Sequence, residues 1–167
     1  MILPVLQYPD ERLTLKSVEI EEVTPEIIEL AADMAETMYA RSGIGLAAPQ
    51  VGKQIRLVVT DITGPDHREQ LMTFINPKLV LSGEEIEWEE GCLSVPDGFT
   101  SNVKRRENVK IEAIGLDGKP FECEADGLHA ICLQHECDHL DGILFIDHIS
   151  RLKRNMYDRK LKKKGKR

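Results

Sequence analysis

The sequence lacks the features that mark membrane, secreted and modular proteins. None of its apolar runs is long enough to span a bilayer, and its N-terminus shows no signal peptide. It has no internal repeat and no linker that would divide it, and its four cysteines fit the reduced state of a cytoplasm better than disulfide bridges. With 167 residues and 41% hydrophobic content, the chain can build one domain with one core. The absent membrane span and signal peptide lead us to expect a cytoplasmic protein with reduced cysteines and no membrane partner.

What the sequence does contain is a short string with the chemistry of a metal site, His-Glu-Cys-Asp-His at residues 135–139. Residues i and i+4 lie on the same face of an α-helix, one turn apart, so His135 and His139 can bind one ion. Glu136 lies between them, where its carboxylate can reach a water molecule on that ion. The string therefore predicts two metal ligands and a general base.

The segment around this string has the pattern of an amphipathic helix. Asp126 is a suitable N-cap and Gly142 a suitable C-terminal stop. Apolar residues at helical spacing lead directly into the two histidines: Leu128, Ile131 and Cys132. Both imidazoles should therefore face the core, where a metal ion would satisfy them and an unpaired imidazole would be costly. The simpler alternative is a core helix that carries two histidines by chance.

Downstream of the string the sequence offers no good third ligand. A metzincin protease would have its third histidine at position 145, which is Phe145 here, and no glutamate of the thermolysin type follows His139. Upstream, Cys92 lies in Glu-Gly-Cys-Leu-Ser-Val-Pro at residues 90–96, where the glycine permits close backbone approach. A Cys/His/His set with one open position is an established catalytic arrangement. Cys92 is therefore the candidate ligand, with a structural thiol as the alternative.

A third unusual segment, Gly-Ile-Gly-Leu-Ala-Ala-Pro-Gln-Val-Gly at residues 43–52, combines small residues with one amide side chain, Gln50. Taken alone, it is best explained as a glycine-rich turn between a helix and a strand. A phosphate-binding loop is excluded, because no Gly-Lys-Ser/Thr follows and the segment comes after a helix instead of opening one.

Together the three segments resemble the signatures of one family, the peptide deformylases, which remove the formyl group from the N-terminal methionine of new bacterial polypeptides. The family's signatures are Gly-x-Gly-Leu-Ala-Ala-x-Gln, Glu-Gly-Cys-Leu-Ser and Gln-His-Glu-x-Asp-His. They stand here complete and in the family's order at residues 43–50, 90–94 and 134–139. The similarity extends over nearly the whole chain, from residue 6 to the basic C-terminus.

The resemblance implies the chemistry of the site. One divalent ion, Fe(II) in the cell with Zn, Ni or Co as alternatives, would be held by Cys92, His135 and His139. Glu136 would take a proton from the attacking water and return it to the departing amine. Oxyanion donors would be the Gln50 side chain and the backbone N–H of Leu93.

The resemblance also implies how a formylated nascent peptide would bind. The peptide would add as a strand along the backbone of Ile44–Gly45 and Glu90–Gly91. Its methionine side chain would enter an apolar pocket lined by Ile44, Trp88, Leu128, Ile131 and Cys132. One departure stands out, because many bacterial relatives carry an arginine shortly after the cysteine motif, where this chain has Phe99.

The rest of the sequence predicts an α+β fold, with small mixed or antiparallel sheets packed around the central helix and a C-terminal helix. Thr24-Pro25 should cap a helix that ends near Arg41. Strands are expected at residues 55–60, 71–75 and 78–81, and a hairpin should pair residues 109–114 with 121–124.

Charge divides the chain into two parts. Residues 151–167 carry ten basic side chains and one acid, whereas the whole chain has a net charge of −7. We therefore expect a catalytic domain at residues 1–150 and a basic C-terminal helix or tail at 151–167. Ser150 should cap that helix, which should dock through Leu152, Met156 and Tyr157. The tail is either a solvated, frayed end or an electrostatic contact to ribosomal RNA. For the whole protein we expect a monomer.

Two other classes of protein share some of these features. A zinc peptidase has the same His-Glu-x-x-His helix, but the Cys92 segment and the short chain argue against it. A non-catalytic, ribosome-associated module with a structural metal would usually supply four protein ligands, and only three are identifiable. A third possibility is a deformylase that prefers another formylated or acylated amine.

Overall fold

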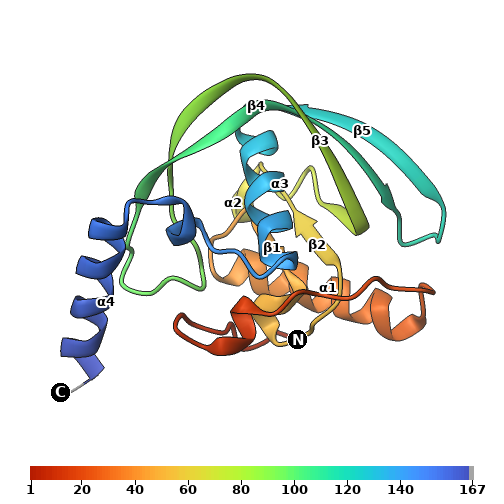
Figure 1. Ribbon diagram of the computed structural model, residues 1–167. Coiled ribbons are helices and arrows are strands. Elements are labelled where there is room, and N and C mark those ends of the chain that lie inside the picture. Colours follow the sequence, from red (N-terminus) through yellow and green to blue (C-terminus); the bar gives the residue numbers. More distant parts are fainter. Residues whose placement is uncertain (166–167) are drawn as a thin grey trace.

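One helix, α3 (Gly127–Leu140), runs through the middle of the computed structural model, which describes residues 1–165 (Figure 1). An antiparallel five-stranded sheet surrounds it in the order β1-β2-β3-β4-β5. The strands β3, β4 and β5 arch over α3, whereas α1 (Pro25–Ala40) packs against β1 and β2, which lie between it and α3 (Figure 1). The predicted α+β class, with an antiparallel sheet around the central helix and a C-terminal helix, is confirmed.

The elements have the following bounds. The strands are β1 Gly45–Ala47, β2 Leu57–Thr60, β3 Met72–Glu90, β4 Ser101–Ile114 and β5 Pro120–Asp126. The other α-helices are α1 Pro25–Ala40, α2 Gly64–His67 and α4 Arg151–Gly165. Three 3₁₀ helices are η1 Glu11–Thr14, η2 Ala48–Val51 and η3 Phe145–His148.

Helix α1 forms as its sequence predicts. The Thr24 hydroxyl accepts a hydrogen bond from the Ile27 N–H at 3.3 Å, and Pro25 occupies the first helical turn, where its missing N–H costs nothing. Met34 and Met38 are fully buried against β1 and β2. This face positions β1 under the functional site.

The prediction of two separate strands at 71–75 and 78–81 is wrong, because both belong to β3, a single strand of 19 residues. Its pairing with β4 shifts register between Ile75 and Lys78 and again between Ser82 and Glu85. Asn76 and Gly83 have positive φ values of 51° and 79° at these points. The turn-forming residues therefore bend the strand through bulges and do not end it.

Helix α3 begins and ends where the sequence predicts, although by different contacts. Asp126 occupies the N-cap position, but its side chain accepts no capping hydrogen bond from the described residues. At the other end, Gly142 has φ 75°, and a Cβ there would lie 2.3 Å from the Thr14 carbonyl oxygen. The close packing of residue 142 against η1 therefore requires glycine and stops the helix.

Helix α4 docks by a different face from the one expected. The Ser150 hydroxyl does accept the capping hydrogen bond from Lys153 N–H at 3.2 Å, as predicted. Leu152 and Met156, however, are 70% and 53% exposed, so their docking role is wrong. Tyr157 is buried, and Leu161 one turn later packs on the same cluster. The helix is therefore rotated relative to the prediction.

None of the helices within residues 1–165 has the length and apolarity to cross a membrane.

Candidate metal centre and active site

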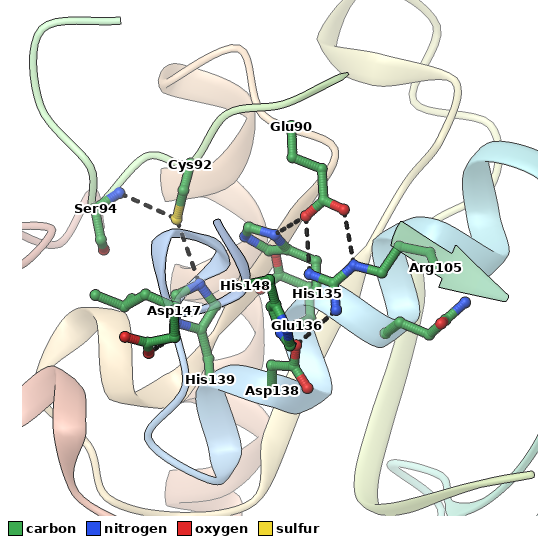
Figure 2. Close-up of polar contacts among 12 residues, drawn as sticks. Glu90, Cys92, Ser94, Arg105, His135, Glu136, Asp138, His139, Asp147 and His148 are labelled. Atoms are coloured by element: carbon green, nitrogen blue, oxygen red, sulfur yellow. Dashed lines mark hydrogen bonds and ion pairs between the residues drawn. The ribbon is translucent and has the colours of Figure 1, made fainter. Parts of the chain in front are cut away.

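Three side chains with metal-binding atoms converge at the inner face of α3 (Figure 2). Cys92 comes from the loop after β3, and His135 and His139 come from successive turns of α3. Their ligand atoms all lie within 4.8 Å of one another, and Cys92 Sγ is 3.3 Å from His139 Nε2. Cys92 and two histidines that follow it by more than forty positions thus form one donor set.

A carboxylate fixes the orientation of the first histidine. His135 Nδ1 donates to Glu90 Oε1 at 2.8 Å, which leaves Nε2 free to face the donor set. Arg105 in turn donates to both oxygens of Glu90, at 2.7 and 2.9 Å, and to Asp138 at 2.6 Å. Asp138 is also 2.9 Å from His148 Nε2. Figure 2 shows this network beside the metal ligands.

Sequence reasoning missed Arg105, Asp138 and His148. A signal for Arg105 exists, because buried and exposed residues alternate along β4 and Arg105 falls in the buried register between Val103 and Val109. An arginine at an inward-facing strand position demands buried carboxylates. The role of Glu90 was also incomplete in the prediction, which used only its backbone.

The buried charges of this site call for a cation. Burial lowers the pKa of His139 well below its usual value, so its imidazole is neutral and can bind metal. For His135, burial acts downward, but Cys92, Glu90 and Glu136 outweigh it and raise the pKa well above the usual value. The thiol and the two carboxyl groups therefore favour a positive charge at this imidazole, and a divalent ion would supply it.

One buried polar atom beside the donor set points to the same conclusion. Glu136 Oε2 finds no hydrogen-bond partner among the described residues. Unpaired polar atoms are rare in protein interiors and mark places where an ion, a water molecule or a ligand belongs. One thiolate with two imidazoles is also the donor chemistry of zinc and iron sites. The residues present thus fit a divalent metal ion.

A cavity of about 370 Å³ opens in front of these ligands. It brings together the side chains that the sequence predicts for catalysis and substrate binding. Its lining includes Ile44, Gly45, Gln50, Trp88, Glu90, Gly91, Cys92, Leu93, Leu128, Ile131, Cys132, His135 and Glu136. His139 lies behind the cavity and is buried. The geometry therefore joins a metal donor set, a buried carboxylate and an apolar pocket.

Comparisons with known proteins agree with this geometry. A sequence profile of the family described as polypeptide deformylase matches residues 2–155. The chain belongs to the polypeptide deformylase family. The predicted resemblance and the predicted enzyme class are thereby confirmed, and with them the use of a divalent metal ion.

Individual members of the family are similar over almost the full chain. A peptide deformylase of Acinetobacter baumannii is 53% identical over 163 residues, which cover 97% of this chain and 91% of that protein. The crystal structure of a peptide deformylase from Legionella pneumophila has a TM-score of 0.92 at 45% identity, with 99% and 96% of the two chains covered. The deformylase from Ehrlichia chaffeensis in complex with actinonin has a TM-score of 0.90 at 39% identity and covers 98% and 97%.

In this deformylase the glycine-rich segment is ordered and closely packed. The predicted turn is wrong, because residues 45–47 form β1 and residues 48–51 form η2. A Cβ at Gly45 would lie 2.7 Å from Cys132 Sγ and 2.9 Å from Glu136 Cγ. Glycine thus lets the β1 backbone approach α3 at the edge of the cavity.

The amide of Gln50 is held in one orientation. Its Oε1 accepts a hydrogen bond from Ala47 N–H at 2.9 Å. Its Nε2 donates to Ser94 Oγ at 3.1 Å and lies 3.5 Å from Cys92 Sγ. The amide donor group therefore faces the metal donor set.

The peptide unit between Cys92 and Leu93 is also fixed. The Cys92 carbonyl accepts a hydrogen bond from Val95 N–H at 3.0 Å, and the Leu93 carbonyl accepts from Gln7 Nε2 at 2.7 Å. In a trans peptide the N–H points opposite to the preceding carbonyl. The Leu93 N–H is therefore directed away from the turn that Val95 closes.

The predicted apolar pocket divides into a floor and a rim. Ile131 and Cys132 are buried, whereas Trp88 and Leu128 are 41% and 39% exposed. Phe99, where many bacterial relatives carry an arginine, turns toward α4 and stacks on Tyr157 with ring centroids 4.2 Å apart. The departure at position 99 therefore belongs to the packing of α4.

Proposed function

We propose that this chain is a metal-dependent hydrolase that removes the N-formyl group from the N-terminal formylmethionine of newly synthesised polypeptides and releases formate. The observation that carries the proposal is the cavity in which the Cys92, His135 and Glu136 side chains meet an apolar pocket. A Cys/His/His donor set with no fourth ligand among residues 1–165 suits catalysis, whereas structural zinc sites are usually closed.

Cys92, His135 and His139 would hold one divalent ion. When bound, the ion supplies the Lewis acidity that makes water a competent nucleophile near neutral pH. We propose Fe(II) as the ion in the cell, because a thiolate among the ligands suits iron as well as zinc. Zn, Ni and Co are alternatives that the same donor set accommodates.

Glu136 would carry the proton. Burial raises its pKa to about 7, so its carboxylate can accept a proton and later release it under the same conditions. Its Oε2, which has no partner in the described part of the chain, is the atom available for this transfer. The acceptor of the proton is the amine that leaves from the formyl carbon.

Two donors would stabilise the negative charge that develops on the formyl oxygen. The Gln50 side chain supplies an amide N–H, and the hydrogen bond from the Ala47 N–H to Gln50 Oε1 fixes the orientation of this amide. Leu93, which lines the same cavity, supplies a backbone N–H. Because both donors are already oriented, little reorganisation is needed when the charge appears.

The substrate would bind as an extended strand along Ile44–Gly45 and Glu90–Gly91. Its methionine side chain would contact Ile131 and Cys132 on the floor and Trp88 at the rim of the pocket. The Ehrlichia chaffeensis deformylase forms a complex with actinonin, which supports the presence of a ligand site in this fold.

The partners follow from this substrate. Formylated nascent chains occur in the bacterial cytoplasm, and the basic α4 offers an electrostatic contact to the ribosome from which they emerge. We propose that the enzyme acts there as a monomer. The division into a catalytic domain at 1–150 and a tail at 151–167 stays a prediction.

Formate release from formyl-Met-Ala-Ser tests the proposal, with protein that is purified without oxygen and loaded with Fe(II). We expect rapid release by the wild type, none from acetyl-Met-Ala-Ser, and loss of activity in Glu136→Ala that still binds metal. Folded, metal-loaded wild type that releases no formate would refute the substrate. Cleavage of internal peptide bonds would favour the zinc peptidase instead.

A further inference from the structure

The inner face of α4 holds the loop that carries Cys92. Phe99 of this loop stacks on Tyr157 at 4.2 Å between ring centroids. The Tyr157 hydroxyl donates to the Pro96 carbonyl at 3.0 Å, and Lys164 Nζ pairs with Asp97 at 2.9 Å. Tyr157 is only 3% exposed, so its ring contact is a packed interior contact.

The same aromatic cluster reaches the metal ligands by two further routes. Phe145 stacks against Phe99 on one side and against the His135 ring on the other, at 6.2 Å in both cases. Tyr8 stacks on Tyr157 at 6.0 Å, and its backbone N–H donates to the Ser94 carbonyl at 2.6 Å. Helix α4 is thus connected to both sides of the donor set.

This support matters because the loop has little structure of its own. Residues 91–100 join β3 to β4 through turns and bends. Within the loop, the Val95 N–H to Cys92 carbonyl bond closes one turn. A ligand on such a loop keeps its position only if neighbouring elements pack against it.

We propose that Tyr157 and Phe99 are positioning residues for Cys92, so that α4 belongs to the scaffold of the metal site and is more than a basic appendage. The proposal rests on metal ligation by Cys92. It also implies that the functional unit extends past residue 150, because Tyr157 supplies the packed ring on which the loop rests.

The test measures how fast the full-length protein loses Co(II) to excess EDTA, together with the thiolate-to-Co(II) absorption band. We compare Tyr157→Leu and Phe99→Leu with Tyr157→Phe, which keeps the ring but loses the bond to Pro96. Leu152→Ala on the exposed face of α4 is the matched control. We expect about tenfold faster loss in the two leucine variants, as is typical when the support of a metal ligand is removed.

The remaining outcomes separate a positioning role from general loosening. The effects of Tyr157→Leu and Phe99→Leu should not add in the double variant, because both remove the same contact. Tyr157→Phe should be intermediate, and Leu152→Ala should match the wild type. Equal rates in all folded variants, or fully additive effects, would overturn the proposal.

A separate result concerns the metal site itself. If circular dichroism shows that Tyr157→Leu is unfolded, the rates of Co(II) loss from Phe99→Leu and Tyr157→Phe decide whether the aromatic contact positions Cys92. A wild type without the thiolate band would overturn Cys92 ligation, and with it this proposal. Formate release by the wild type would still report on the proposed function independently.

Discussion

Two buried glutamates lie on opposite sides of the His135 ring, and their environments differ completely. Glu90, at the end of β3, is 2.8 Å from Nδ1 and receives two hydrogen bonds from Arg105. Glu136, on α3, has Oε1 3.8 Å from Nε2, and its Oε2 finds no partner among the described residues.

The difference appears in their acidity. Burial pushes the pKa of Glu90 upward, but the bonds from Arg105 and His135 outweigh it and lower the value to about 2. Burial dominates for Glu136, and its pKa rises to about 7. The same carboxyl group is thus an anion at neutral pH at one position and able to gain or lose a proton near pH 7 at the other, as the proposed mechanism requires. Partners, more than burial, decide which role a carboxylate takes.

The largest effect should come from removing the proton carrier. In Glu136→Gln we expect kcat for formyl-Met-Ala-Ser to fall by about 10²–10⁴-fold, because general acid–base transfer is lost. Metal content should not change, since Cys92, His135 and His139 remain. Steady-state kinetics with metal analysis check this, and a Glu136→Gln enzyme with near-normal kcat would remove Glu136 from the proposed mechanism.

Removing the partner of Glu90 should be nearly as costly, but to stability. Arg105→Met leaves the buried Glu90 and the half-buried Asp138 without their cation, and breaking a buried pair typically costs about 3–5 kcal/mol. Urea unfolding measures the loss. The matched control is Lys104→Met, whose exposed side chain is 3.9 Å from Glu85 and should contribute less than about 1 kcal/mol. Similar losses in both variants would contradict the network.

The two glutamates should respond to pH in opposite directions in the metal-free protein. Glu90 has a lowered pKa, so its contribution is present above its ordinary value of 4.5 and disappears as pH falls toward about 2. Glu136 has a raised pKa, so its ionisation costs stability above pH 7, and that cost disappears as pH falls toward 4.5. Each effect amounts to about 3 kcal/mol at most.

Urea unfolding between pH 3 and 8 tests this contrast. Glu136→Gln should be more stable than the wild type at pH 8 and equal to it near pH 4.5. Glu90→Gln should be less stable than the wild type at pH 7, with a gap that narrows at acid pH. Parallel pH profiles for the two variants would show that the carboxylates do not differ as described.

The smallest effect concerns the metal. Glu90→Gln keeps a hydrogen-bond acceptor for His135 but loses the charge, so we expect Co(II) affinity to fall by about 10–100-fold. Competition with a chelator measures the affinity. A value unchanged from the wild type would mean that Glu90 orients His135 without tuning the metal.

The local part of this architecture can be predicted from the sequence. The spacing of His135 and His139 places both on one face of α3, since helical periodicity depends only on neighbouring residues. The caps of α1 and α4 at Thr24 and Ser150 are equally local. The three family signatures, at residues 43–50, 90–94 and 134–139, also lead to the metal donor set and the family.

Other features depended on contacts between distant segments. The bulges that keep β3 continuous arise from its pairing with β4, although the same residues look like breaks in the sequence. The face of α4 that docks is chosen by Phe99 and Tyr8, from two other parts of the chain.

The contrast between Glu90 and Glu136 is the clearest case. Their positions in the chain already place both glutamates next to the predicted metal-ligand motifs. Folding brings Arg105 to Glu90 and leaves Glu136 Oε2 without a partner among the described residues. A pKa in the interior depends on which charges approach within a few ångströms, and the packing of distant strands and helices sets those distances.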